Sequence, residues 1–180
     1  PGIAEKVRVA PERMRVAIVR QRYNPYGGAE RFIERTLPAL GRSGAEVTLI
    51  ARSADGWGAR RLLAVDPFYI GSAWRDASFA RAARRAWETG KFDLVQSHER
   101  IAGCDLYRAG DGVHAEWLDI RRAAAGPAFG SPGRIGIALN PYHRYACAAE
   151  RRMFGDPRLR AVICNSNMVR AEILRRFQVA

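Results

Sequence analysis

The sequence predicts an α/β fold built on a parallel β-sheet, because short β-branched segments alternate with longer amphipathic ones. The first β-branched run is Arg15–Arg20, and the turn-forming residues Asn24–Gly28 end it. From Ala29 to Leu40 apolar residues recur at helical spacing, and a second strand-like run follows at Glu46–Ala51. A strand, a helix and a strand in this order form a β-α-β unit, whose right-handed crossover makes the two strands parallel.

The same alternation continues to the end of the chain. Further strands are expected at residues 62–66, 92–97, 105–109 and 161–164. Further helices are expected at residues 74–89 and 141–153 and after a cap at Asn165 or Ser166. We expect Trp74, Ala83 and Trp87 to share a buried stripe and Pro38 to kink its helix. The segment 124–136, rich in glycine and proline, is predicted to be a loop.

Length and composition favour one folded domain. The chain has 180 residues, 48% of them hydrophobic, with 30 Lys+Arg against 18 Asp+Glu and a net charge of +12. Residues 1–13 are polar and aperiodic, so we interpret them as a leader or an extension before a domain at 14–180. The excess of arginine indicates attraction to phosphates on nucleotides, nucleic acid or a membrane, or a compositional bias of the source genome.

Cysteine usage and hydropathy indicate a cytoplasmic protein. The three cysteines are far apart and form no C-x-x-C pair, so neither a disulfide framework nor a zinc site is expected. No apolar stretch has the length of a membrane-spanning helix, and the N-terminal residues have no apolar signal-peptide core.

Gly27 and Gly28 form the first candidate site, at the join between the first strand and the first helix. Glycines allow close approach of a ligand, and the free N–H groups of a helix start favour an anion. The alternative is a tight turn without a ligand. A dinucleotide fingerprint is not present, because no third glycine follows and the second strand ends in Ala51-Arg52 without an acid.

Two further candidate sites follow later strands. His98 and Glu99 come directly after the strand at 92–97 and are suited to proton transfer or to binding sugar hydroxyls. Alternatively, His98 is a surface histidine and Glu99 pairs with Arg100. Asp111 stands between two glycines after the strand at 105–109, where its carboxylate can accept a hydrogen bond or act as a weak base, or can stabilise its own turn.

A basic and aromatic region follows this turn. Arginine beside aromatic side chains suits the interface of an anionic membrane, although an ordinary solvated face has the same composition. The residues assigned to this membrane surface are Trp117, Arg121, Arg122, Arg144, Arg151 and Arg152.

Other functional classes receive little support. His98 and His114 lack a metal-ligand spacing such as H-E-x-x-H, and no P-loop or G-x-S-x-G occurs, so no metal is expected. A basic phosphate- or nucleic-acid-binding protein remains an alternative, but the arginines are spread along the chain and no known nucleic-acid-binding motif is present. The incomplete glycine fingerprint argues against an NAD-dependent oxidoreductase.

Several motifs together resemble the N-terminal half of the retaining glycosyltransferases of family 4. Among these enzymes, the glucosyltransferases of lipopolysaccharide core assembly are the most similar. The motifs are Asn24–Arg31, Asp93–Glu99, Gly110–His114, Tyr142–Glu150 and Ala161–Ser166.

The resemblance implies a GT-B enzyme, in which two Rossmann-like domains with helices on both faces of a parallel sheet face each other across a cleft. This chain would be the N-terminal, acceptor-side domain. Gly27 and Gly28 match the loop near the phosphates of a UDP-sugar donor, such as UDP-glucose, and Asp111 matches an acidic position implicated in catalysis. His98, Glu99 and His114 fall where family members line the acceptor pocket, and the acceptor would be a lipopolysaccharide-core or similar glycolipid.

The resemblance also implies a location and a partner. The region after Asp111 corresponds to the part that these enzymes lay against the inner face of the plasma membrane. The donor nucleotide and the E-x7-E motif belong to a second, C-terminal GT-B domain that residues 1–180 do not include. We therefore expect these residues alone to be inactive in transfer, as a truncated or domain-only product.

Overall fold

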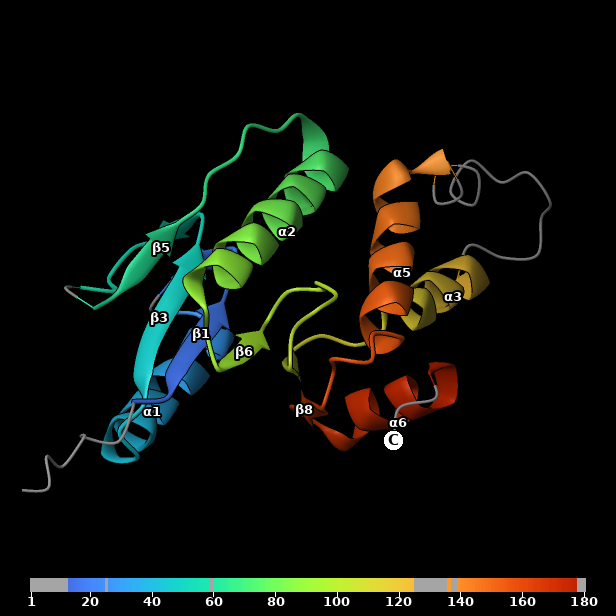
Figure 1. Ribbon diagram of the computed structural model, residues 1–180. Helices are drawn as coiled ribbons and strands as arrows, with labels where there is room; N and C mark the ends of the chain where they lie inside the picture. Colours follow the sequence, from blue (N-terminus) through green and yellow to red (C-terminus); the bar gives the residue numbers. More distant parts are fainter. Residues whose placement is uncertain (1–12, 25, 59, 125–135, 137–138, 178–180) are drawn as a thin grey trace, which may run out of the picture.

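Six parallel strands form one sheet, as the sequence predicts (Figure 1). The computed structural model describes residues 13–24, 26–58, 60–124, 136 and 139–177. The strand order is β5-β3-β1-β6-β7-β8, so β1 lies between β3 and β6. The strands are β1 (Arg15–Val19), β3 (Glu46–Ala51), β5 (Leu62–Ala64), β6 (Leu94–Ser97), β7 (Leu106–Ala109) and β8 (Ala161–Cys164). Two short strands, β2 (Arg22–Tyr23) and β4 (Ser53–Ala54), form a separate parallel pair.

Helices connect the strands at the predicted positions, with one addition. The helices are α1 (Gly28–Arg42), α2 (Gly71–Gly90), α3 (His114–Ala124), α5 (Pro141–Phe154) and α6 (Asn167–Arg176). Helix α3 was not expected from the sequence, because only Leu118 of its residues is fully buried and its apolar periodicity is weak. Helix α1 continues through Pro38, and the Ser166 hydroxyl caps α6 by accepting from Val169 N–H. Most of the predicted loop at 124–136 lies outside the described residues.

Helices cover both faces of the sheet, because alternate side chains of each strand point to opposite sides. In β1, Ala17 and Val19 face a core formed with α2, α5 and α6. Val16 and Ile18 face the other core, which includes Ile33 of α1. Helices α2 and α5 also pack against each other on the first face (Figure 1). None of the described helices has both the length and the apolar character needed to cross a membrane.

The predicted buried stripe of α2 is wrong at its first position. Trp87 and Ala83 are buried, with Trp87 at 3% exposure, but Trp74 is 51% exposed and packs edge-on against Phe68. A helix of 20 residues is about 30 Å long, whereas the strands below it are shorter, so the first turn of α2 extends past the sheet. Of the aromatic side chains of α2, Phe79 and Trp87 are the buried ones.

Candidate functional site at the carboxyl edge of the sheet

The loops after β1, β6 and β7 meet at one edge of the sheet. Val19 is paired with Ser97, and Ser97 with Tyr107, so β1 and β6 end at the same level and β7 extends two residues farther in the same direction. In open α/β sheets this edge is where ligands bind. The structure therefore brings together the glycine loop, the segment with His98 and Glu99, and the turn with Asp111.

Arg20 connects the first two of these segments. Its Nε donates to Glu30 Oε1 at 3.0 Å, and its Nη1 donates to Glu99 Oε1 at 3.2 Å. The Gln21 backbone N–H also donates to Glu99 Oε1, at 2.9 Å. The nearby carboxylates Glu99 and Glu30 raise the pKa of Arg20 against the opposing effect of its burial, and Asp111 adds to the raising effect. Arg20 thus binds the carboxylates of Glu30 and Glu99 at the end of β1.

Gly27 is required by the position of Glu30. The sequence pattern places Glu30 on a solvated face of α1, but its exposure is only 2%. It packs against the helix start so closely that a Cβ at Gly27 would overlap its carboxylate. Gly28 has open space around it among the described residues. The two glycines, treated alike in the sequence, therefore differ: Gly27 accommodates Glu30, and Gly28 leaves the first turn of α1 accessible.

His98 lies beneath the edge. It is 8% exposed, its Nε2 is 2.9 Å from the Gln96 side-chain amide, and its ring lies near Phe32 of α1. Burial, together with the cationic Arg108 and Arg20, lowers the pKa of His98 to about 3. The imidazole is therefore neutral at pH 7, and its buried Nδ1 has no hydrogen-bond partner among the described residues.

Glu99 and Arg100 do not pair with each other, contrary to the alternative expected from their adjacency. Glu99 binds Arg20, whereas Arg100 Nε donates to Glu150 Oε1 of α5 at 2.8 Å. Burial raises the pKa of Glu99, against the opposing effects of Arg20 and of the hydrogen bond from Gln21. Adjacent side chains after a strand point in different directions, so each finds a partner far away in sequence.

The turn Gly110–Gly112 is held by three other elements. Asn165 Nδ2, after β8, donates to the Gly110 carbonyl at 2.6 Å, and Arg100 Nη2 donates to the Gly112 carbonyl at 3.4 Å. Glu172 of α6 accepts from the Val113 N–H at 2.9 Å, and a Cβ at Gly112 would come within 2.6 Å of its Oε2. The backbone of the turn is thus fixed while the Asp111 side chain is exposed. Among the described residues, the Asp111 carboxylate makes no hydrogen bond to the turn, so it is available to another molecule.

Arg108 is a second cation of this edge, and sequence reasoning missed it. It lies on β7 with its guanidinium over the Phe32 ring, 4.7 Å from the centroid. Burial and Arg20 lower the pKa of Arg108, while Glu30 and Asp111 oppose this effect. An arginine inside an otherwise apolar strand run is the signal that could have identified it.

His114 begins α3 and packs into an aromatic cluster with α5. Its Nε2 is 3.0 Å from His143 Nδ1, and its ring stacks on Trp117 at 5.5 Å. Burial, Arg100 and His143 together lower the pKa of His114 to about 4. Its backbone N–H donates to Glu150 Oε1 at 2.8 Å. Glu150 therefore binds both Arg100 and the backbone that follows the Asp111 turn.

The predicted membrane surface divides into two parts. Trp117, Arg121 and Arg122 lie exposed on α3, with the Arg121 guanidinium over the Trp117 ring. Arg122, on α3, is bound to Asp119 of the same helix at 3.0 Å. Arg144 and Arg151 are seven residues apart and share one helical face, whereas Arg152 is turned about 100° from Arg151 toward α2.

Within the described residues, no group of three or more metal-ligating side chains is gathered.

Comparisons with known proteins bear on the family and the fold of the chain. A family model described as Glycosyltransferase Family 4 matches residues 26–180. The fold is similar to the crystal structure of WaaG, a glycosyltransferase involved in lipopolysaccharide biosynthesis, with a TM-score of 0.74 and 21% identity. That match covers 92% of this chain but only 42% of the WaaG chain. The sequence has no match among curated proteins.

The two glycines should respond differently to alanine. Gly27→Ala forces the buried Glu30 carboxylate away from Arg20, so we expect a loss of about 1–3 kcal/mol in the free energy of unfolding. Gly28→Ala should change it by less than about 1 kcal/mol, in the stabilising direction, because alanine loses less backbone entropy. Urea denaturation followed by circular dichroism measures both, and equal effects would contradict the assigned packing of Glu30.

The buried neutral His98 predicts a pH-dependent stability. Its pKa falls from 6.5 to about 3 on folding, so the unfolded chain binds a proton below pH 6.5 that the folded chain excludes. This titration leaves the free energy of unfolding unchanged above pH 6.5. Between pH 6.5 and pH 3 it lowers the free energy of unfolding, by up to about 1.4 kcal/mol per pH unit. We expect the stability difference between the wild type and His98→Gln to shrink between pH 7 and 4. A difference that stays constant over this range would show that His98 is not held neutral.

Proposed function

We propose that this chain, which belongs to glycosyltransferase family 4 because that family's model matches residues 26–180, is the acceptor-side domain of a retaining transferase. The transferase moves a hexose from a UDP-sugar, UDP-glucose in our proposal, to a lipopolysaccharide-core or similar glycolipid. The observation that carries this proposal is the fixed turn with an exposed Asp111 at the same edge of the sheet as the glycine loop, the edge where open α/β sheets bind ligands.

The roles of the edge residues follow from their chemistry. Asp111 accepts a hydrogen bond from the acceptor hydroxyl and orients it toward the donor. Gly28 opens the N-terminus of α1 to the donor diphosphate, whose charge the free N–H groups and Arg108 attract. Glu99 and His114 contribute hydrogen bonds to the acceptor. His98, because it is buried, acts by supporting the loop and Phe32.

The second half of the active site comes from outside residues 1–180 in this proposal. The chain spans 42% of the WaaG chain, and its cations at the edge are largely neutralised by their own carboxylates. Half a cleft provides neither stacking for the base nor contacts for the ribose, so donor binding to these residues alone is about millimolar or weaker. We expect no metal in the reaction, and residues 1–180 alone should not transfer sugar.

The α3–α5 face carries the membrane contact in this proposal. Arg122, Arg144 and Arg151 are exposed on α3 and α5, and α3 also carries the half-exposed Trp117, which together is the combination that favours lipid phosphates and headgroup depth. Such a face would hold the protein on the inner surface of the plasma membrane, where a glycolipid acceptor is available.

The transfer reaction can be tested in two steps. Reading the gene downstream of the Ala180 codon should reveal a second domain with an E-x7-E motif, and a stop codon there would contradict the two-domain transferase. In the two-domain protein, Asp111→Asn should lower kcat for UDP-glucose turnover by about 10²-fold, the contribution of a positioned acid or base. The control Asp55→Asn changes an exposed aspartate of the β4–β5 connection and should have no effect. Equal activities of the two variants would remove Asp111 from the reaction.

The membrane contact can be tested with vesicles. The variant Arg122, Arg144 and Arg151→Gln should bind phosphatidylglycerol vesicles about 100-fold more weakly than the wild type, since each basic residue near an anionic surface contributes about 1 kcal/mol. The control changes Arg31, Arg35 and Arg42 of α1 to Gln, which removes the same charge from an exposed helix on the other face of the sheet. Co-sedimentation measures both, and equal losses would mean that net charge, not this face, determines binding.

A further inference from the structure

Helix α3 begins at His114, three residues after Asp111, and its start is capped by another helix. The Val113 carbonyl accepts the first hydrogen bond of α3, from the Trp117 N–H at 3.1 Å, so Val113 is the N-cap residue. A valine side chain has no acceptor for the free N–H groups of a helix start. Glu116 stands three residues after Val113, the position from which a glutamate folds back to accept from the N–H of the N-cap residue.

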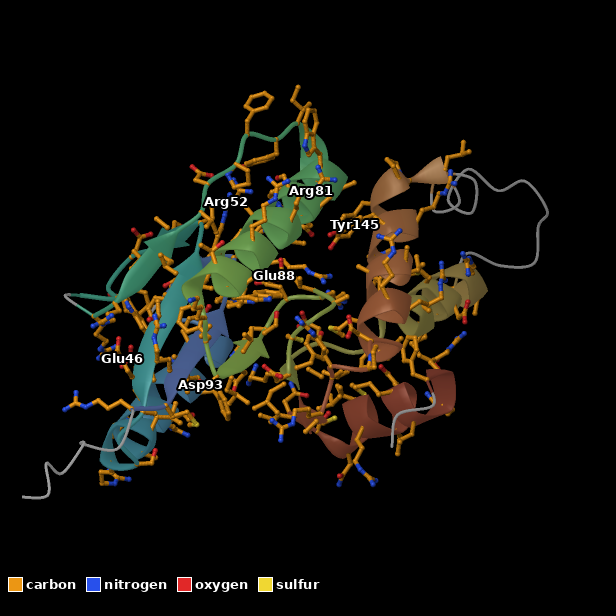
Figure 2. All side chains as sticks on the ribbon, viewed as in Figure 1. Glu46, Arg52, Arg81, Glu88, Asp93 and Tyr145 are labelled. Carbon is orange, nitrogen blue, oxygen red and sulfur yellow. The ribbon has the colours of Figure 1, made fainter. Side chains whose placement is uncertain are left out.

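Glu116 is bound to α6 instead. Its Oε1 accepts from Arg176 Nε at 3.0 Å and from Arg175 Nε at 3.3 Å. Arg176 also binds Asp119, one turn farther along α3. Polar side chains lie where these two helices approach each other (Figure 2). The carboxylate that would cap α3 locally is therefore held by the arginines of α6.

Glu172 of α6 supplies the acceptor that the start of α3 needs. Its Oε2 accepts from the Val113 N–H at 2.9 Å, where a carboxylate also complements the positive end of the helix dipole. A Cβ at Gly112 would come within 2.6 Å of the same oxygen, so the carboxylate lies directly against the backbone of the turn. Gly112 has no positive φ, so the closeness of Glu172, and not a left-handed backbone, requires glycine at this position.

The other end of the Asp111 turn is held by the same segment of chain. Asn165, which directly precedes the N-cap residue of α6, donates from Nδ2 to the Gly110 carbonyl at 2.6 Å. Asp111 therefore lies between two fixed points, the Gly110 carbonyl and the Val113 N–H, and residues 165–172 bind both. Glycines on either side leave the backbone of Asp111 little stiffness of its own, so these contacts determine where its carboxylate lies.

We propose that Glu172 is a positioning residue for Asp111: it caps α3 in place of Glu116 and thereby fixes the Asp111 carboxylate at the edge of the sheet. This inference rests on the proposed function, in which Asp111 orients the acceptor hydroxyl, and adds the group that sets the position of Asp111. A misplacement of about 1 Å in a reacting geometry lowers a rate by up to about 10²-fold. A carboxylate that does not touch the substrate therefore contributes to the rate through the turn that it holds.

Steady-state kinetics of the two-domain protein, at saturating acceptor, test this role. Glu172→Ala should lower kcat for transfer from UDP-glucose by about 10-fold and leave the KM for UDP-glucose within about twofold, because the turn moves while the glycine loop does not. Gly112→Ala, which pushes the carboxylate away from the turn, should reproduce this loss. Glu172→Gln should keep kcat within about threefold of the wild type, since its amide oxygen can still accept from the Val113 N–H. In an Asp111→Asn background, Glu172→Ala should cause no further loss, because both changes act through one carboxylate.

Glu116→Ala is the matched control. It removes one carboxylate from the same contact between α3 and α6 but leaves the hydrogen bond from Val113 to Glu172, so kcat should stay within about twofold of the wild type. Equal losses in Glu116→Ala and Glu172→Ala would overturn the proposal, because docking of the two helices would then determine the rate. A loss from Glu172→Ala that persists in full in the Asp111→Asn background would overturn it as well.

The same variants separate this inference from the proposed function. If Asp111→Asn lowers kcat and Glu172→Ala does not, the positioning role alone is refuted. If Asp111→Asn has no effect, the role of Asp111 in the proposed function is refuted, and the positioning role of Glu172 with it.

Discussion

The ion pairs of Arg20 are the interaction on which the arrangement of the site depends. Arg20 follows the central strand β1, and its guanidinium binds Glu30 of α1 and Glu99 after β6. Glu30 is almost fully buried, and a buried carboxylate without its partner is strongly destabilising. The position of the glycine loop and that of the β6 loop are therefore not independent: each is fixed through the same cation. Arg100 has the equivalent role one strand farther along, where it binds Glu150 and the Gly112 carbonyl.

Several of the arginines that give this chain its charge have different structural surroundings. Arg20, Arg52 and Arg100 are bound to carboxylates of neighbouring segments, so their charge stabilises the fold and is largely neutralised. Arg144 and Arg151 are exposed on α5, and Arg81 and Arg152 line a shallow hollow between α2 and α5. The net charge of +12 is therefore neither one binding surface nor a uniform compositional excess. Some of these arginines form ion pairs, so replacing one of them would leave its carboxylate partner unpaired. Others are exposed and available to anions.

The alternation of strands and helices and the location of the candidate site could be predicted from the sequence, because both follow from hydrophobic runs and from the common edge of parallel strands. The partners of the polar residues could not. Glu30 has the spacing of a solvated residue, yet it is buried because Arg20, from another element, reaches it. Arg108 stands in a strand run and gives no sign that Phe32 lies beneath its guanidinium. Helix α3 has too few buried positions to produce a periodic pattern, since it packs mainly against α5.

The electrostatic balance at the edge has a consequence for how the domain works. Glu30 and Glu99 bind Arg20, and the negative charges of Glu30 and Asp111 also act on Arg108, so the edge offers little net positive charge. A diphosphate approaching this edge meets helix N–H groups and a shared pair of cations, which is not enough to hold a doubly charged ligand firmly in water. Strong donor binding needs a second surface that excludes water and adds contacts, whereas an exposed Asp111 needs only a hydroxyl beside it. The physical chemistry of this edge is thus better matched to positioning an acceptor than to retaining a nucleotide sugar, which agrees with the acceptor-side function proposed for the domain.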